Sequence, residues 1–217
     1  MRRPLNTNHS PRMSIVIGLT GGIGAGKSTA SLYLQGKGLP VVDADRISRE
    51  LTGPGARGSE AVARTFGRDY LNCTGAMDRR KMRELVFRDD EARARLETIL
   101  HPMITEEIER QIKKACADHP VVIFDCPLLT TNSSWRGLVD RILVIDAADD
   151  VRVERILKRP GLTEEIARSI ISKQPPRKMI LDFADDVIVN MGSSDELYGA
   201  LDHLVSVWTC DAAGRRS

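Results

Sequence analysis

The feature that most constrains this chain is a glycine-rich segment between a predicted strand and a predicted helix. It matches G-x-x-x-x-G-K-[ST] over residues 21–28, after an apolar run at 14–20 and before a helix-like segment at 28–35. Glycines let backbone N–H groups point at phosphate oxygens, and the start of a helix adds free N–H groups and its positive dipole end. A glycine-rich turn without a ligand is the alternative. The strand–loop–helix context favours a nucleoside triphosphate site.

Two side chains of this loop and one distant carboxylate have predicted roles. Lys27 would reach the β- and γ-phosphates, and the Ser28 hydroxyl would ligate Mg²⁺. Asp125 ends the apolar run 121–125. In P-loop enzymes a carboxylate at the end of such a strand positions Mg²⁺. The predicted nucleotide contacts in the loop are Gly22, Ile23, Gly24, Ala25, Gly26, Lys27, Ser28 and Thr29.

Further apolar runs predict the fold class. They lie at 40–43, 121–125, 141–146 and 186–190, and helical patterns separate them. Continuous rather than alternating apolarity indicates parallel strands that are covered on both faces. We therefore expect an α/β domain with a five-stranded parallel sheet, whose ligands bind beyond the carboxyl ends of the strands.

An insertion at about 52–117 is far longer than one crossover helix requires. Its pattern predicts helices at 59–66, 78–87 and 91–116, with a break or kink at Pro102. We expect a helical subdomain that binds the acceptor substrate.

A second segment, about 149–180, is rich in basic residues and predicts a helical lid. Arg155 and Arg159 are four residues apart and would share a helix face, while Pro160 and Gly161 could form a hinge. Arginines over a transferring phosphoryl group would neutralise developing charge. The alternative is a solvated amphipathic helix whose arginines pair with neighbouring glutamates.

The segment Asp43-Ala44-Asp45 ends the strand predicted from the second apolar run. Residues two apart on a strand share a face, so both carboxylates could point into a cleft, where one accepts the proton of an attacking hydroxyl. Alternatively, one of them caps a helix that starts near Arg46. The sequence leaves both readings open.

Composition describes an ordinary globular protein, with 41% hydrophobic and 29% charged residues among 217. The net charge of +2 does not indicate a nucleic-acid or membrane partner. The four cysteines form no C-x-x-C pair, which favours a reducing cytoplasm. Residues 1–12 are expected to be a disordered extension, with Met13 a possible start, and 210–217 a flexible tail. The domain would then span 13–209.

Over about residues 15–208 the chain resembles the dephospho-coenzyme A kinase family, a group of P-loop kinases. The residues that carry the resemblance are Leu19–Thr29, Asp43–Asp45, Asp78–Lys81, Phe87, Leu96–Pro102, Asp125–Leu129 and Ala184–Gly192. Two stretches depart from the family pattern: Thr130-Thr131 replace an aromatic residue and Glu, and Pro175-Pro176 replace a charged run after Gln174.

The resemblance implies transfer of the ATP γ-phosphoryl group to the ribose 3′-hydroxyl of dephospho-coenzyme A, the last step of coenzyme A synthesis. It implies Asp45 as the base, with Lys27 and Arg159 also in catalysis. Arg79, Arg83 and His101 would hold the acceptor together with Asp45. Arg155 and Arg159 would belong to the lid, with Arg155 also among the nucleotide-binding residues, and Asn190 and Gly192 would lie near the adenine of ATP.

Two other functions remain open on the sequence. One is a P-loop kinase of another small acceptor, such as a nucleoside monophosphate. The other is a nucleotide-dependent switch, although Leu128 stands where D-x-x-G would place glycine after Asp125, and N-K-x-D is absent. We expect small-molecule substrates, neither nucleic acid nor membrane as a partner, and a monomer or small homo-oligomer.

Overall fold

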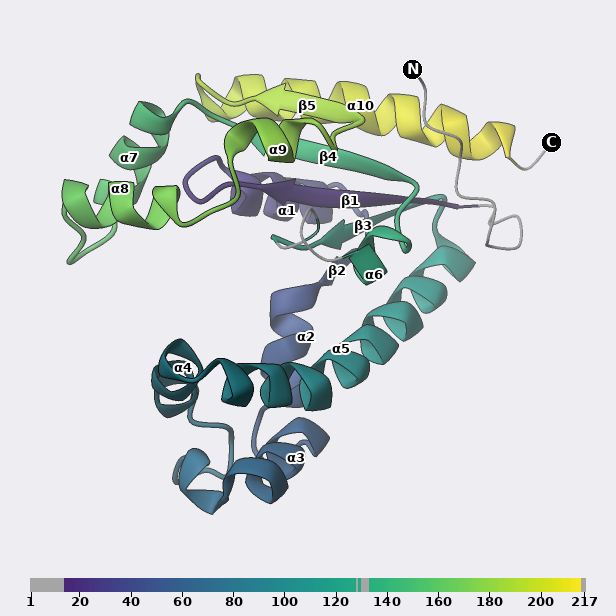
Figure 1. Ribbon diagram of the computed structural model, residues 1–217. Coiled ribbons are helices and arrows are strands. Elements are labelled where there is room, and N and C mark those ends of the chain that lie inside the picture. Colours follow the sequence, from purple (N-terminus) through teal and green to yellow (C-terminus); the bar gives the residue numbers. More distant parts are fainter. Residues whose placement is uncertain (1–13, 128, 130–132, 216–217) are drawn as a thin grey trace. The chain divides into compact units, whose positions relative to one another are not determined.

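The computed structural model describes residues 14–127, 129 and 133–215, which form two compact units (Figure 1). The first unit comprises the described residues up to Val42 and from Ile112 onward, and the second comprises Asp43–Gln111. The expected extension at 1–12 and the Thr130-Thr131 departure lie outside the described residues. The expected insertion, 52–117, falls largely within the second unit.

The first unit is built on a parallel sheet. Its strands are β1 (Ile15–Gly21), β2 (Val41–Asp43), β3 (Val121–Asp125), β4 (Arg141–Asp146) and β5 (Asp186–Val189), in the order β2-β3-β1-β4-β5. The register places Leu19 opposite Asp125 and Gly21 opposite Ile145, so the ends of β3 and β4 flank the loop that follows β1. The predicted five-stranded fold is confirmed, with each strand boundary within one residue of expectation.

Six helices of the described chain accompany this sheet in the first unit. They are α1 (Lys27–Gly36), α6 (Ser133–Arg136), α7 (Asp149–Leu157), α8 (Glu164–Ser172), α9 (Arg177–Leu181) and α10 (Ser194–Gly214). Helices α1 and α10 pack on one face, where Leu34, Leu201 and Trp208 join the strand residues of a continuous buried core. On the other face, Trp135 of α6 meets Phe124 of β3 edge-on. Both faces of the sheet are therefore covered, as its apolar strands require.

The second unit is helical. It contains α2 (Ala44–Leu51), α3 (Arg57–Phe66), the short 3₁₀ helix η1 (Arg68–Tyr70), α4 (Arg79–Arg88) and most of α5 (Asp90–Asp118). Asp78 caps α4 by accepting hydrogen bonds from the backbone N–H groups of Arg80 and Lys81, and these bonds lower the pKa of Asp78.

Of the break or kink expected at Pro102, the break is wrong, because α5 continues through this residue. Proline removes one backbone hydrogen bond from a helix. On either side of it, Leu100, Ile104 and Ile108 are buried, and this packing holds the helix together.

The expected flexible tail also requires correction, because α10 extends through Gly214. Ala212 is fully buried, Asp211 pairs with Arg141 at 3.3 Å, and Arg215 pairs with Asp140 at 2.9 Å. The two ion pairs hold the C-terminal end of α10 beside the start of β4. Within the described part of the chain, no helix combines the length and the apolarity needed to cross a membrane.

Candidate active site

The phosphate loop, residues 21–28, joins β1 to α1 in a tight turn. The Ala25 N–H donates to the Gly22 carbonyl at 3.1 Å, and Gly24 and Gly26 adopt left-handed φ values of 78° and 105°. Only glycine adopts such values without strain. No side chain caps α1 at Gly26, so the N–H groups of its first turn face the loop without a competing oxygen from a cap.

Two of the loop glycines, Gly22 and Gly26, also leave room for the side chains of Arg152 and Asn190 to pack closely against the loop. A Cβ atom at Gly22 would lie 2.5 Å from Nη2 of Arg152, and one at Gly26 would lie 2.3 Å from Nδ2 of Asn190. Any larger residue would displace these side chains. The glycines therefore serve the packing of the loop as well as access to its N–H groups.

Lys27, the first residue of α1, forms an ion pair with Asp125 at the end of β3. Both side chains are largely buried, with 17% of Lys27 and 7% of Asp125 exposed. The structure thus brings together the two charged residues that the sequence selected from segments 98 residues apart. Their opposite charges suit a site for a phosphate and a divalent cation.

Ser28 and Asp125 are chemically suited to Mg²⁺. Ser28 is exposed in the first turn of α1, and its hydroxyl, like a carboxylate, offers a hard oxygen donor. The described residues contain no cluster of three or more His, Cys, Asp or Glu side chains that could hold a metal by itself. Mg²⁺ commonly keeps several waters and takes one or two carboxylates plus substrate phosphates, so a sparse donor set fits this ion.

Asn190 and Arg155 contact the loop from β5 and α7. The Asn190 amide donates to the Ala25 carbonyl at 2.7 Å, and Arg155 Nη1 donates to the Asn190 carbonyl at 3.0 Å. Asn190 is 7% exposed and Arg155 is half-buried. Gly192 lies beyond Asn190, and both line a cavity of about 210 Å³ between β5 and α10.

Arg159 is placed differently from expectation. Helix α7 ends at Leu157, so Arg159 lies in the link to α8 and does not share a helix face with Arg155. A residue that precedes proline is disfavoured in the helical conformation, and Arg159 precedes Pro160. Its side chain is exposed.

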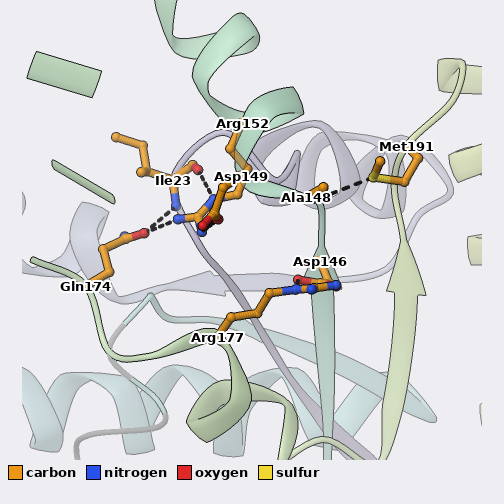
Figure 2. Close-up of polar contacts among 8 residues, drawn as sticks. All are labelled: Ile23, Asp146, Ala148, Asp149, Arg152, Gln174, Arg177 and Met191. Carbon is orange, nitrogen blue, oxygen red and sulfur yellow. Dashed lines mark hydrogen bonds and ion pairs between the residues drawn. The ribbon is translucent and has the colours of Figure 1, made fainter. Parts of the chain in front are cut away.

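Figure 2 shows polar contacts that the sequence analysis missed. Arg177, at the start of α9, donates to both carboxylate oxygens of Asp146 at the end of β4, with Nε 2.9 Å from Oδ1. Hydrogen bonding to Asp146 raises the pKa of Arg177. The strand-end pattern that selected Asp125 applies equally to Asp146, and could have found it. Two further residues, Arg152 and Gln174, contact Ile23 of the loop.

In the second unit, the two readings of Asp43 and Asp45 separate. The Asp43 carboxylate accepts a hydrogen bond from the Arg46 N–H at 3.0 Å and caps α2. Asp45 lies inside the first turn of that helix. The expectation that the pair shares a strand face is wrong, because β2 ends at Asp43 and the helix begins at the next residue.

The predicted acceptor residues Arg79 and Arg83 both belong to α4, near Asp45. Arg79 Nη2 donates to the Thr52 hydroxyl at 2.8 Å and to the Ser48 carbonyl at 3.2 Å. Burial lowers the pKa of Arg79, as do the neighbouring charges of Arg49 and Arg83, while Asp45 opposes the shift. Arg49, Arg79 and Arg83 thus form a positively charged cluster near Asp45, and Arg49 also lies 4.0 Å from Oδ2 of Asp43. His101 lies on α5 and is half-buried.

The chain is similar in sequence to known dephospho-CoA kinases. A family model described as dephospho-CoA kinase matches residues 15–196. A dephospho-CoA kinase from Albidiferax ferrireducens is 45% identical, with 80% of this chain and 82% of the relative covered. One from Aromatoleum aromaticum is 40% identical over 92% of this chain and 94% of its own.

Solved structures agree on the fold. The dephospho-CoA kinase from Campylobacter jejuni superposes with a TM-score of 0.64 at 22% identity, and covers 90% of this chain and 98% of its own. A shikimate kinase from Bacteroides thetaiotaomicron superposes with a TM-score of 0.51 at 14% identity, and covers 89% and 97%. At these identities the likeness concerns the fold alone.

Proposed function

The chain belongs to the dephospho-CoA kinase family, and on that premise we propose that it phosphorylates the ribose 3′-hydroxyl of dephospho-CoA with ATP. The products would be coenzyme A and ADP, in the last step of coenzyme A biosynthesis. The observation that carries the proposal is the phosphate loop with its Lys27–Asp125 pair, in a chain that the family model matches from residue 15 to residue 196.

ATP is the co-substrate that a kinase family implies, and the first unit supplies the groups to bind it. N–H groups of the loop and of the first turn of α1 would hold the triphosphate, and Lys27 would stabilise the charge that develops on the γ-phosphoryl group. Asn190 and Gly192 line the cavity that we assign to the adenine. Arg155 and the exposed Arg159 would contribute positive charge from the lid.

Mg²⁺ is part of the same proposal. The Ser28 hydroxyl and the Asp125 carboxylate would hold it, with waters and phosphate oxygens completing its shell. When bound, the ion supplies positive charge to the β- and γ-phosphates.

The second unit supplies the groups that suit the acceptor. Arg79 and Arg83 carry positive charge for its phosphates, and we propose that His101 contributes to the same site. Asp45 would accept the proton of the attacking hydroxyl. Asp45 suits this role better than Asp43, because the Asp43 carboxylate already caps α2.

The rest of the proposal concerns location and partners. We propose a cytoplasmic enzyme of small-molecule substrates that acts as a monomer or small homo-oligomer and without a nucleic acid or membrane partner. The four cysteines, which form no C-x-x-C pair, support a reducing compartment.

An acceptor panel tests the activity. The purified chain with Mg²⁺ and ATP is given dephospho-CoA, AMP, shikimate or no acceptor, and ADP formation is followed together with the mass of the product. We expect phosphorylation of dephospho-CoA alone. Lys27→Ala serves as the control and should lose a factor of about 10²–10³ in rate. A higher kcat/KM for AMP, or ADP formation that no acceptor accelerates, would overturn the proposal.

A further inference from the structure

Ile23, in the phosphate loop, is held on three sides by the segment that contains α7 and α8. Its N–H donates to Oε1 of Gln174 at 3.1 Å, and its carbonyl accepts a hydrogen bond from Nε of Arg152 at 2.9 Å (Figure 2). Its side chain packs against the small core that Val153 and Ile156 of α7 form with Ala167 of α8. Both backbone polar groups and the side chain of one loop residue are therefore fixed from outside the loop.

Burial and two loop glycines, Gly22 and Gly24, position Arg152 for its hydrogen bond to the Ile23 carbonyl. Its side chain is 8% exposed and pairs with Asp149 at 2.9 Å through Nη1. A Cβ atom at Gly24 would lie 2.7 Å from the Arg152 carbonyl oxygen, and one at Gly22 would meet the guanidinium. The helix can approach the loop this closely only because both positions are glycine.

Gln174 contributes a single atom to two hydrogen bonds. Its Oε1 accepts from the Ile23 N–H and also from Nη2 of Arg152. A carboxylate oxygen can accept both of these bonds, as an amide oxygen does, whereas an apolar side chain of similar size accepts neither.

A short strap, residues 174–177, holds Gln174 in place. At its other end Arg177 donates hydrogen bonds to both carboxylate oxygens of Asp146. Pro175 and Pro176 lie between Gln174 and Arg177. Proline fixes φ and so restricts the freedom of the strap. Gln174 is thereby tied to the end of β4, the strand that neighbours β1.

We propose that Gln174 and Arg152 are positioning residues that hold the phosphate loop in its nucleotide-binding form, and that the 174–177 strap is the device that orients Gln174. Neither residue needs to touch ATP. They fix the peptide groups before and after Ile23, and the loop N–H groups that follow are oriented as a result. Preorganisation of this kind raises affinity because less ordering is left for the ligand to impose. The inference rests on the proposed use of ATP at this loop.

Three variants test it. Gln174→Leu removes the accepting oxygen, Gln174→Glu keeps it, and Gln35→Leu makes the same exchange at an exposed position of α1. For each, the KM values for ATP and for dephospho-CoA, kcat, the dissociation constant of ATP by calorimetry without acceptor, and Tm are measured.

Gln174→Leu removes the acceptor of the Ile23 N–H and of Arg152 Nη2, and only the first of these bonds orients the loop directly. We expect it to weaken ATP binding and raise the KM for ATP about tenfold, which corresponds to the contribution of one well-formed hydrogen bond. The KM for dephospho-CoA and Tm should remain near wild type. Gln174→Glu should restore ATP affinity to within about twofold, and Gln35→Leu should match wild type.

Three outcomes would overturn the inference. They are an unchanged ATP dissociation constant in Gln174→Leu, failure of Gln174→Glu to restore it, and an equal rise in both KM values with a large fall in Tm. Calorimetry tests this inference independently of the proposed acceptor, because it measures ATP binding whether or not dephospho-CoA is the acceptor.

Discussion

Asp43 and Asp45 show how a single residue step changes the chemistry available to a carboxylate. Asp43 ends β2 and caps α2 through the Arg46 N–H, whereas Asp45 is inside the helix and close enough to Arg79 to affect its pKa. A cap oxygen is already engaged, and a carboxylate beside an arginine cluster is available for a substrate hydroxyl. The two positions therefore give a matched pair for mutation.

Asp45→Asn should lower kcat by about 10²–10⁴ while ATP binding is kept, because an amide cannot accept the proton. The lower end is favoured, since a dissociative transition state needs less help from a base. Asp43→Asn should retain near-wild-type turnover and lose only a few tenths of a kcal/mol, because Asn caps helices about as well as Asp. Steady-state kinetics and a thermal melt measure both. A damaging Asp43→Asn beside a mild Asp45→Asn would reverse the assignment.

At the scale of an element, α5 shows how helix stability can depend on pH. Arg110 donates to both carboxylate oxygens of Glu107, with distances of 2.8 and 2.6 Å, and Gln111 donates at 2.7 Å. Hydrogen bonds from Arg110 lower the pKa of Glu107 from 4.5 to about 2. Because the folded-state pKa is depressed, the charged form stabilises the fold above pH 4.5, and this contribution is lost as the pH falls toward 2.

Glu107→Gln should therefore be less stable than wild type at pH 7, by less than about 1 kcal/mol because the pair is partly exposed to solvent. The difference should shrink below pH 4.5. Urea unfolding at pH 7, 5 and 3 measures it, and Glu109→Gln, an exposed change on the same helix, is the matched control. A stability difference that is constant across this range would show that the ion pair does not titrate as described.

At the scale of the whole molecule, the proposed groups for ATP and for the acceptor are on different compact units. Lys27, Asp125, Arg155 and Asn190 belong to the first unit, and Asp45, Arg79 and Arg83 belong to the second. A ligand protects backbone amides by stabilising the region that it binds against local opening.

We predict that each substrate protects a different unit. A non-hydrolysable ATP analogue should slow hydrogen exchange in residues 14–42 and 141–192, with the largest change in the phosphate loop. Dephospho-CoA alone should slow exchange mainly in α2 and α4. Exchange measured by mass spectrometry with each ligand separately distinguishes the two patterns. Protection by dephospho-CoA confined to the first unit would contradict the assignment of the acceptor residues.

Local patterns in the sequence were sufficient for the sheet and for the loop. Each strand is a short apolar run, and the phosphate loop combines neighbours in sequence, so the interactions that define them are local. Lys27 and Asp125 could each be selected in advance because each carries its own local signature, whereas their ion pair is a contact of the folded chain. The strand-end rule could have added Asp146, which has the same signature.

The contacts of Arg152, Gln174 and Arg177 were decided by the tertiary structure. Arg152 and Ile23 are 129 residues apart, and nothing near Arg152 in sequence distinguishes it from the other arginines of its segment. Likewise, only the end of β2 decided which carboxylate caps α2. Sequence determined which groups are present and which local structures form. The packing of α7 on the loop determined which of them meet, because a side chain's partner depends on distances that the chain acquires only when folded.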